Sequence, residues 1–418
     1  MGHLLVIESW VGSMSRLLPR AIREGGHTFT FLTRDLHHYL RQAPEGTAHP
    51  LLGARNVITA DTNDTETLLP RVERLHEVLG FDGVLTSCDY YLPAAARVAA
   101  RLGLPGPPPA AVEDACRKDA TRRVLAAAGL PQPRHAVHRD RPDLVRAARD
   151  IGYPLVVKPV DLCAGMYVRR VDDEEQLVAA VSAMDDFPVN ARGQRRAPVV
   201  LLEALLDGPE VSVETVSHAG DVHVVGVTDK SVGAAPAFVE TGHMFPAALT
   251  PADTEAVRHT AVAALRALGL ADGVVAHTEI KLTSDGPRVV EVNPRPAGNR
   301  ITELVRHVTG VDLAAAQVDL ALGRAPDLGT VDTGLRSAAV GFLLPEATGT
   351  LRALDAGGLA DDTGVLEFTL AEPGRAVRAA DSNNDYLGHV MAGDTEGPGA
   401  RHRVEELLAG LRAGLVVR

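Results

Sequence analysis

The sequence predicts an α/β protein of several domains, and three features support this prediction. Strand-like and helix-like segments alternate through about the first hundred residues, a proline-rich break follows them, and a later strand-rich region ends in a hairpin with a charged face. A regular alternation of strands and helices is typical of a parallel sheet, so the first unit is expected to be a parallel α/β domain. The 418 residues are enough for two to four domains with cores of their own.

Within this first unit, the short apolar run HLLVIES is followed by a helix and then by the strand HTFTFLT. Gly12 and Ser13 are expected to begin that helix, and Gly25 and Gly26 to end it. The strand RNVITAD, a helix over about residues 64–80, the strand DGVLTS and a further helix repeat the pattern. The proline-rich segment PGPPPAAVED then indicates a domain boundary.

Beyond that boundary the order of elements is mixed. A helix in ACRKDATRRVLAAAGL precedes the short buried strand YPLVVKPV, and another helix follows in VDDEEQLVAAVSAM. The region from residue 197 to 230 is rich in strands, and a helix is predicted from Pro251 to Leu270. Two more helices follow the charged hairpin. The last section, from about Asp332, combines short strands with a final amphipathic helix.

The composition limits the class of protein. A net charge of −12 argues against a general nucleic-acid-binding surface. The three cysteines are odd in number, lie far apart and lack metal-ligand spacing, which favours a reducing compartment. The first residues lack the features of a signal peptide, and no apolar run reaches the length of a membrane span. We therefore expect a cytoplasmic protein without nucleic-acid or membrane partners.

Lysine is rare in this chain. Only four of the 42 basic residues are lysine, namely Lys118, Lys158, Lys230 and Lys281. The preference for arginine is consistent with a coding bias. The remaining lysines then either survive by chance or mark sites that need a compact ammonium rather than a planar fork.

The segment HTEIKLTSDGPRVVEVNPR indicates two strands joined by a turn. If Ser284, Asp285 and Gly286 form a three-residue loop, Glu279 lies directly across from Glu291. The alternation then divides the hairpin into a core face and a polar face. The core face comprises Thr278, Ile280, Leu282, Val290 and Val292, and the polar face comprises His277, Glu279, Lys281, Glu291, Asn293 and Arg295.

Two carboxylates that face each other repel unless a cation lies between them. Oxygen ligands in this arrangement suit Mg²⁺, which keeps water molecules and takes substrate phosphates as further ligands. Arg295 adds a bidentate fork for a phosphate or carboxylate beside the metal. The alternative is a solvated polar face on an exposed sheet, but the ending Asn-Pro-Arg after a buried apolar alternation favours the metal site.

Further candidate residues lie outside the hairpin. Lys158 ends an apolar strand, and the glycine-poor loop DLCAG that follows is placed to fold over phosphates. Lys118 begins a helix, with Arg122 expected on its surface side. Glu203 and Glu210 flank the turn DGP, where one acid and backbone groups are placed to bind an adenine and the other acid to bind ribose hydroxyls. A simple turn is the alternative interpretation of this last segment.

Taken in order, Lys118, VVKP, LLEALLDGPEVSVE, HTEIK and EVNPR closely resemble the motifs of the ATP-grasp superfamily. The match extends over most of the chain, and the last two motifs are specific when paired. The resemblance implies an ATP-grasp fold with an N-terminal Rossmann-like domain, a small α+β lid, a central α+β domain and a C-terminal subdomain that completes the large domain. The expected ranges of these four units are 1–112, 113–200, 201–330 and 331–418.

The resemblance also implies a role for each motif residue. The ligands it implies are ATP and Mg²⁺, with Mn²⁺ as the alternative metal. Lys118 and Lys158 would contact ATP phosphates, and Lys230 would close over the γ-phosphate. The other roles are Glu203 and the backbone of Leu206 for adenine, Glu210 for ribose, Glu279, Glu291 and Asn293 for magnesium, and Arg295 for the transferring phosphoryl group or acyl phosphate.

Within the superfamily, FVETGHMFPAAL and the C-terminal segments RSAAVGFLLPEATG and SNNDYLGHVMAGD resemble the L-amino-acid ligase branch. There Glu240 and His243 would lie near the metal and the substrate, and Arg300 would face a substrate carboxylate. The implied enzyme activates a small-molecule carboxylate as an acyl phosphate and couples it to an amine, with release of ADP and phosphate. A homodimer is expected from the resemblance alone. The alternatives are a carboxylating or purine-pathway ATP-grasp ligase, and a nucleotide-binding module without catalysis.

Overall fold

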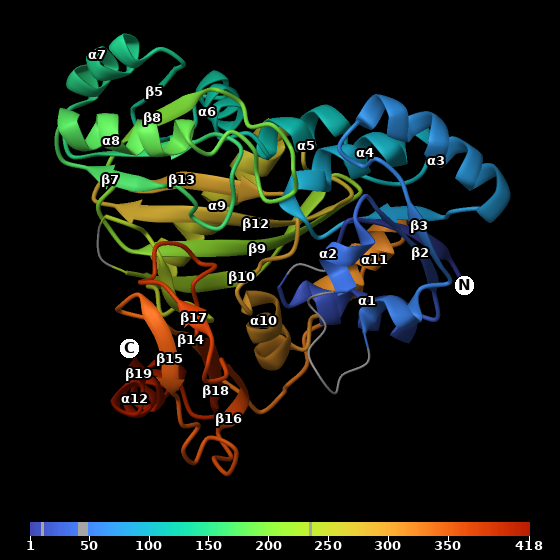
Figure 1. Ribbon diagram of the computed structural model, residues 1–418. Helices are drawn as coiled ribbons and strands as arrows, with labels where there is room; N and C mark the ends of the chain where they lie inside the picture. Colours follow the sequence, from blue (N-terminus) through green and yellow to red (C-terminus); the bar gives the residue numbers. More distant parts are fainter. Residues whose placement is uncertain (10–11, 41–48, 234–235) are drawn as a thin grey trace.

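A parallel sheet with the strand order β3-β2-β1-β4 forms the centre of the N-terminal domain (Figure 1). The computed structural model describes residues 1–9, 12–40, 49–233 and 236–418, and it confirms the predicted α/β fold. Helix α3 begins after Asp64, whose carboxylate accepts a hydrogen bond from the Glu66 N–H at 3.1 Å, and it ends at Gly80, where φ is 64°. The elements of this domain are β1 (His3–Ile7), α1 (Met14–Glu24), β2 (Thr28–Thr33), α2 (Leu36–Leu40), η1 (Pro50–Gly53), β3 (Asn56–Thr59), α3 (Thr65–Leu79), β4 (Gly83–Leu85), η2 (Asp89–Tyr91) and α4 (Leu92–Arg101).

Helices cover the N-terminal sheet on both faces. All five residues of β1 are buried, as expected for a parallel strand with helices on each side. Helices α3 and α4 cover one face. Helix α1 covers the other face together with α11 (Leu313–Ala321), whose Ala314 and Val318 join the same apolar cluster as Leu18 and Phe31. A helix from a distant part of the chain therefore ties the N-terminal domain to the rest of the molecule.

The lid is a separate antiparallel sheet with the strand order β5-β8-β6-β7, seen at the upper left of Figure 1. Its two helices pack on the sheet through Leu144, Ala148, Leu177 and Val181. Helices α5 (Pro109–Ala115) and α6 (Lys118–Ala127) precede the lid strands. The lid elements are β5 (His135–His138), α7 (Arg141–Ile151), β6 (Leu155–Pro159), β7 (Arg169–Val171), α8 (Glu174–Asp185) and β8 (Val200–Ala204).

An eight-stranded sheet forms the body of the molecule, with the order β13-β12-β9-β10-β11-β14-β18-β16. The C-terminal section continues this sheet through β14, β18 and β16. Helix α12 packs on β14 and β18, and a separate small sheet has the order β17-β15-β19. Among the described residues, no helix has the length and apolar character needed to cross a membrane. The remaining elements are β9 (Glu210–His218), β10 (Asp221–Val232), β11 (Glu240–Phe245), α9 (Pro251–Leu268), β12 (Val274–Thr283), β13 (Gly286–Asn293), α10 (Ile301–Thr309), β14 (Ser337–Leu343), β15 (Gly349–Ala353), β16 (Val365–Leu370), β17 (Ala376–Val377), β18 (Gly388–Asp394), α12 (Ala400–Ala413) and β19 (Val416–Val417).

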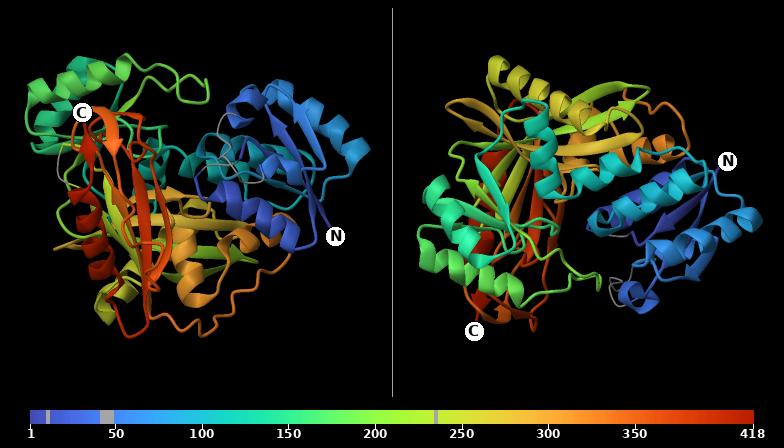
Figure 2. Two further views of the ribbon diagram at one scale, coloured as in Figure 1. Left: turned by 60° about the horizontal axis from the view of Figure 1, so that its bottom comes forward. Right: turned by 90° about the horizontal axis from the view of Figure 1, so that it is seen from above.

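A segment of the lid reaches across to the N-terminal domain. We call residues 188–196, between α8 and β8, the arm; the right-hand view of Figure 2 shows this green segment extending from the lid toward the blue domain. The carbonyl of Arg192 accepts hydrogen bonds from Arg34 and Asn63, each at 2.9 Å. The side-chain amide of Gln194 donates to the carbonyl of Tyr90 at 3.2 Å. The arm therefore joins the lid directly to the N-terminal domain.

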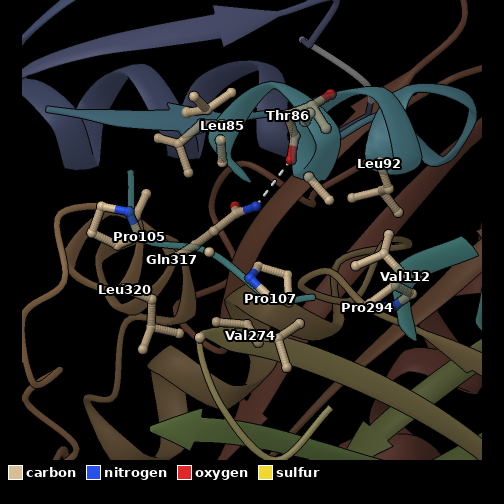
Figure 3. A pocket seen from close by; sticks show the side chains of 18 residues that line it. Leu85, Thr86, Leu92, Pro105, Pro107, Val112, Val274, Pro294, Gln317 and Leu320 are labelled. Atoms are coloured by element: carbon tan, nitrogen blue, oxygen red, sulfur yellow. Dashed lines mark hydrogen bonds between the residues drawn. The ribbon is translucent and has the colours of Figure 1, made fainter. Parts of the chain in front are cut away.

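A small apolar cavity of about 70 Å³ lies between the N-terminal domain and the central sheet. Figure 3 shows Leu85, Leu92, Val274 and other apolar side chains around it, and Gln317, whose amide donates to the carbonyl of Thr86 at 2.9 Å. No charged side chain is among the described residues that line this cavity. It is a packing defect at a domain interface rather than a place for an ionic ligand.

Candidate active site

The charged hairpin is formed by β12 and β13, and Glu279 lies across from Glu291 as predicted. The route to that pairing differs from the expected one. Thr283 pairs with Gly286, so the turn contains two residues rather than three. A bulge next to Glu279 then shifts the register by one residue and leaves Val290 as the extra residue.

The bulge also corrects the predicted core face of the hairpin. Val289 is fully buried and packs with Val292, whereas Val290 is only partly buried. Val290 was expected in the core, and that expectation was wrong because one inserted residue exchanges the faces of the strand on either side of it. Glu291 and Glu279 nevertheless share one face.

Lys118 connects the hairpin to the lid. Its Nζ lies 2.9 Å from Oε1 of Glu291 and donates to the carbonyl of Leu162, in the loop after β6, at 2.7 Å. Burial lowers the pKa of Lys118, but Glu291 outweighs this effect and raises the pKa above its ordinary value. The ammonium is therefore charged and holds the lid loop next to Glu291.

Glu203 lies between two cations. Nε of Arg122 is 2.5 Å from one of its carboxylate oxygens, and Nζ of Lys158 is 2.7 Å from the other. Burial raises the pKa of Glu203, but the two cations outweigh it and hold the pKa at about 2. Burial lowers the pKa of Lys158, and Glu203 does not fully offset this because the nearby positive charge of Arg122 lowers the pKa further.

Arg122 corrects another expectation. It was expected on the surface side of its helix, but it is one of the largest fully buried side chains of the described residues. Besides Glu203, its guanidinium donates to the carbonyls of Val289 and Val290, each at 2.8 Å. The bulge in β13 thus presents two consecutive backbone carbonyls to Arg122, and a sequence pattern does not reveal them.

Lys230 brings three of the predicted acids together. Its Nζ lies 2.8 Å from Glu279, 3.0 Å from Glu240 and 3.1 Å from Glu210. Burial lowers the pKa of Lys230, but these carboxylates outweigh it and raise the pKa well above its ordinary value. His243 binds the second oxygen of Glu240 through Nε2 at 3.1 Å.

Behind these acids, His277, which was predicted on the polar face of the hairpin, pairs with Glu214, which was not predicted. Nδ1 of His277 is 3.0 Å from Glu214, and Nε2 is 3.2 Å from Glu279. Burial lowers the pKa of His277, but Glu214 and Glu279 outweigh it and raise the pKa to about 9. Glu210, Ser212 and Glu214 occupy every second position of β9 and so share one face of the strand. This alternation could have identified Glu214 from the sequence.

Arg295 is oriented by the N-terminal domain. Its Nε lies 2.6 Å from Oδ1 of Asp89, and one terminal nitrogen donates to the carbonyl of Pro296 at 3.0 Å. Burial lowers the pKa of Arg295, but Asp89 outweighs it and raises the pKa. Asp89 follows β4 at the carboxyl end of the parallel sheet, a position common for functional residues, yet it was not predicted.

Two predicted residues are placed differently from this cluster. The guanidinium of Arg300 lies 2.9 Å from Glu303 and 3.0 Å from Glu367, so two carboxylates already compensate its charge. Its role toward a substrate carboxylate stays a prediction. Leu206 lies in the segment between β8 and β9, partly buried, and its backbone contact with adenine also stays a prediction.

The buried charges of these residues fall into two groups. Where α6 meets the lid strands, three cations accompany one carboxylate: Lys118, Lys158 and Arg122 against Glu203. On the central sheet, five carboxylates accompany three cations: Glu210, Glu214, Glu240, Glu279 and Glu291 against Lys230, Lys281 and protonated His277. One group therefore favours an anion and the other a cation.

The hairpin has donors for a metal ion, but not a complete set. No group of three or more His, Cys, Asp or Glu side chains that would hold a metal occurs in the part of the chain that the structure describes. Glu279, Glu291 and Asn293 offer two carboxylates and one amide on neighbouring strands. This set fits Mg²⁺, which accepts water and phosphate oxygens as its other ligands.

Comparison with known proteins gives the family. The chain matches three family profiles: ATP-grasp N-terminal domain over residues 20–106, ATP-grasp domain over residues 151–303, and L-amino acid ligase C-terminal domain 2 over residues 341–416. A crystal structure of L-amino acid ligase from Bacillus licheniformis superposes with a TM-score of 0.82 and 24% identity, covering 100% of this chain and 98% of that one. At this identity the likeness shows the fold.

Relatives by sequence extend the match. The uncharacterized protein y4rH of Sinorhizobium fredii (strain NBRC 101917 / NGR234) is 30% identical over 94% of this chain and 81% of its own length. Alanine–anticapsin ligase of Bacillus subtilis (strain 168) is 26% identical over 75% of this chain and 72% of its own length. Carnosine synthase 1 of Mus musculus is 28% identical over 78% of this chain, which spans only 40% of that protein. The chain belongs to the ATP-grasp family.

Proposed function

We propose that the protein is an ATP-dependent ligase that joins a carboxylate to an amine as an amide and releases ADP and phosphate. The observation that carries this proposal is the divided charge of the cleft. An excess of cations around Lys118 and Lys158 suits the phosphates of a nucleotide, and an excess of carboxylates around Glu279 suits a metal that accompanies them. Arg295 directly follows the hairpin strand that carries Glu291 and Asn293, and Asp89 anchors it.

In the proposed reaction the chain binds and orients its substrates. Lys118 and Lys158 hold the phosphates, and Arg295 compensates charge on the phosphoryl group while an acid's carboxylate oxygen attacks the γ-phosphorus. The bond from the γ-phosphorus to its bridging oxygen breaks, and ADP leaves with the electron pair. An amine then attacks the acyl carbon, phosphate leaves with the electrons of the C–O bond, and the amine nitrogen loses a proton.

The other predicted residues have supporting parts in this proposal. Glu279, Glu291 and Asn293 would hold Mg²⁺, with Mn²⁺ as an alternative, and the metal would supply positive charge next to the phosphate oxygens. Lys230 would place its positive charge next to the γ-phosphate. Glu240 and His243 would contact the substrate. The adenine and ribose roles of Glu203, Leu206 and Glu210 also belong to the proposal.

The relatives support this class of reaction. An L-amino acid ligase and an alanine–anticapsin ligase are named for joining amino acids, and a 2-oxoglutarate carboxylase domain with the same fold was solved with MgADP. The proposed substrates are a small-molecule acid and an amine, used in the cytoplasm where ATP is available. A homodimer also stays a proposal, because it rests on the resemblance alone.

A screen of amino acids and related acids with Mg-ATP tests the proposal. ADP, AMP and hydroxamate are measured in the same reactions, with hydroxylamine present to trap an acyl phosphate. We expect one or more acids to give ADP and a hydroxamate together. Replacement of hydroxylamine by a panel of amines then identifies the second substrate.

Other products would point to other functions. AMP would mean attack at the α-phosphorus and would exclude this mechanism. ADP formation that requires bicarbonate would indicate a carboxylating ligase. No nucleotide cleavage with any acid would favour a nucleotide-binding module without catalysis.

A further inference from the structure

A second cavity, of about 360 Å³, lies directly beside the proposed catalytic residues. It has contributions from several parts of the chain: Tyr90 of the N-terminal domain, Lys118 of α6, Leu162 in the loop after β6, Gln194 of the arm, and Glu291 of the hairpin. Its volume lies at the lower end of the range typical of small-molecule sites, roughly 300–1,000 Å³. Leu92 and Pro294 also line the apolar cavity of Figure 3, so the two cavities lie back to back.

The charged groups that line this second cavity can be accounted for one by one. Each carboxylate has a cation: the pairs are Asp89 with Arg295, Glu113 with Arg97, Asp161 with Arg196, and Glu291 with Lys118. Among the cations, Arg117 binds Asp119 through two nitrogens at 2.8 and 3.1 Å. Within the described residues, this leaves Arg195 as the lining cation without an acidic or hydrogen-bonding partner for its side chain.

We propose that this cavity binds the amine substrate and that Arg195 binds an anionic oxygen group, a carboxylate or a phosphate, carried by that substrate. The guanidinium fork of arginine suits either group. The buried hydroxyl of Tyr90 lies next to the thiol of Cys163, a weak hydrogen-bonding group, and it offers a further donor in the same cavity. This inference rests on the proposed function, because it assigns the second substrate of that same site.

The arm holds Arg195 on a rigid support. Asn190 accepts from the N–H groups of Arg192 and Gln194 at 2.9 and 3.1 Å, and its amide donates to the side chain of Gln194 at 2.9 Å. The guanidinium of Arg192 lies over the ring of Tyr39, 5.5 Å from its centroid. Backbone pairing of Arg195 with Val189 closes the arm. When such a residue binds a ligand, its backbone loses little further entropy, and the main entropic cost is the ordering of its side chain.

The geometry gives the substrate a direction. Lys118, Glu291 and Asn293 line the same cavity as Arg195, which comes from the arm. An anionic group held by Arg195 leaves the amine end of the molecule free to approach the acyl phosphate near Arg295. Arg195 is therefore a positioning and specificity residue rather than a catalytic one.

The test compares wild-type protein with Arg195→Gln and Arg195→Lys, using an acid that gives a hydroxamate in the screen above. Acceptor amines are offered in matched pairs that differ in the anionic group: L-alanine and L-alaninamide, L-phenylalanine and L-phenylalaninamide, and O-phosphoethanolamine and ethanolamine. The control is Arg139→Gln, because Arg139 is also an exposed lid arginine but does not line the cavity.

We expect Arg195→Gln to raise KM for the anionic acceptor roughly ten- to hundredfold, the range for loss of a hydrogen bond to a charged group. The rate with hydroxylamine and the KM for the neutral acceptor should change less than twofold, and Arg195→Lys should recover part of the loss. The pair in which the anionic acceptor is used best shows whether Arg195 binds a carboxylate or a phosphate.

Two results would overturn the inference while leaving the ligase proposal intact. One is hydroxamate formation with wild-type preference for neutral acceptors over their anionic partners. The other is an equal effect of Arg195→Gln on both members of a pair. If no acid gives ADP and hydroxamate, the proposed function itself fails.

Discussion

Replacement of Glu203 by glutamine tests whether this buried carboxylate holds the lid strands to α6. One of its oxygens binds Arg122 and the other binds Lys158, at 2.5 and 2.7 Å. A glutamine amide can accept from only one of these groups and presents its NH₂ to the other. The variant therefore leaves two buried cations without an anion between them.

The expected loss follows from the pKa of Glu203. Burial raises this pKa, but Arg122 and Lys158 outweigh the effect and lower it from 4.5 to about 2. That difference corresponds to roughly 3 kcal/mol of folding free energy. The removal of one partner from a buried ion pair typically costs about 3–5 kcal/mol, so the two figures agree.

The sign of the pH dependence is fixed by the direction of this shift. A depressed carboxylate pKa stabilises the folded state fully above pH 4.5 and loses that contribution as the pH falls toward 2. The stability difference between wild type and Glu203→Gln should therefore be constant near neutral pH and shrink below pH 4.5.

Urea unfolding at several pH values measures this difference, and hydrogen exchange of β6 and β8 locates it. Glu174→Gln is the matched control, because Glu174 also pairs with an arginine, Arg149, but both side chains are largely exposed. The double variant Lys158→Met with Glu203→Gln should lose less than the two single variants together, because it removes one of the stranded cations. The reasoning fails if Glu203→Gln is no more destabilising than Glu174→Gln, or if its effect does not change between pH 7 and pH 3.

Three further predictions concern the active-site residues and the lid loop. Glu291→Gln should lower magnesium-dependent ADP formation at least hundredfold while the protein still folds, although Lys118 loses its carboxylate partner; near-normal turnover would mean that the hairpin is not the metal site. Asp89→Asn should lower kcat about tenfold without raising the KM for ATP, because Asp89 orients the guanidinium of Arg295. Arg295→Lys should lower kcat further, because lysine keeps the charge but lacks the bidentate geometry of the guanidinium. Hydrogen exchange of residues 161–167 should slow when Mg-ATP is added, and equal exchange with and without it would count against a lid that closes.

The hairpin shows how a correct pairing can follow from an incorrect turn. Glu279 was placed opposite Glu291 by a three-residue loop, whereas the chain makes a two-residue turn and inserts Val290 further along. Both routes add one residue to the same strand, so the acids still meet. The position of a bulge depends on what the strand packs against, here Arg122 donating to two consecutive carbonyls, and no local pattern records that contact.

Residues that act within one element were predictable, and residues that act across domains were not. Lys158 at the end of an apolar strand and the alternating polar residues Glu291 and Asn293 of β13 follow from periodicity alone. Asp89 and Arg295 are 206 positions apart in the chain, and Lys118 meets Leu162 across 44 positions. Such contacts are fixed by how the N-terminal domain, the lid and the central sheet pack together, and that packing is set by many weak interactions rather than by a motif.

The rarity of lysine has a practical consequence for chemical modification. Lys118, Lys158 and Lys230 are buried in the cleft, and Lys281 lies beside Glu210 with a side chain that is only 19% exposed. Apart from the α-amino group, an acylating reagent or an amine-specific cross-linker therefore finds its targets inside the cleft and hardly any on the outer surface. Because these ammonium groups are buried and ion-paired, the folded protein should react with such reagents mainly at its α-amino group, and labelling of the lysines should become fast only when the protein unfolds.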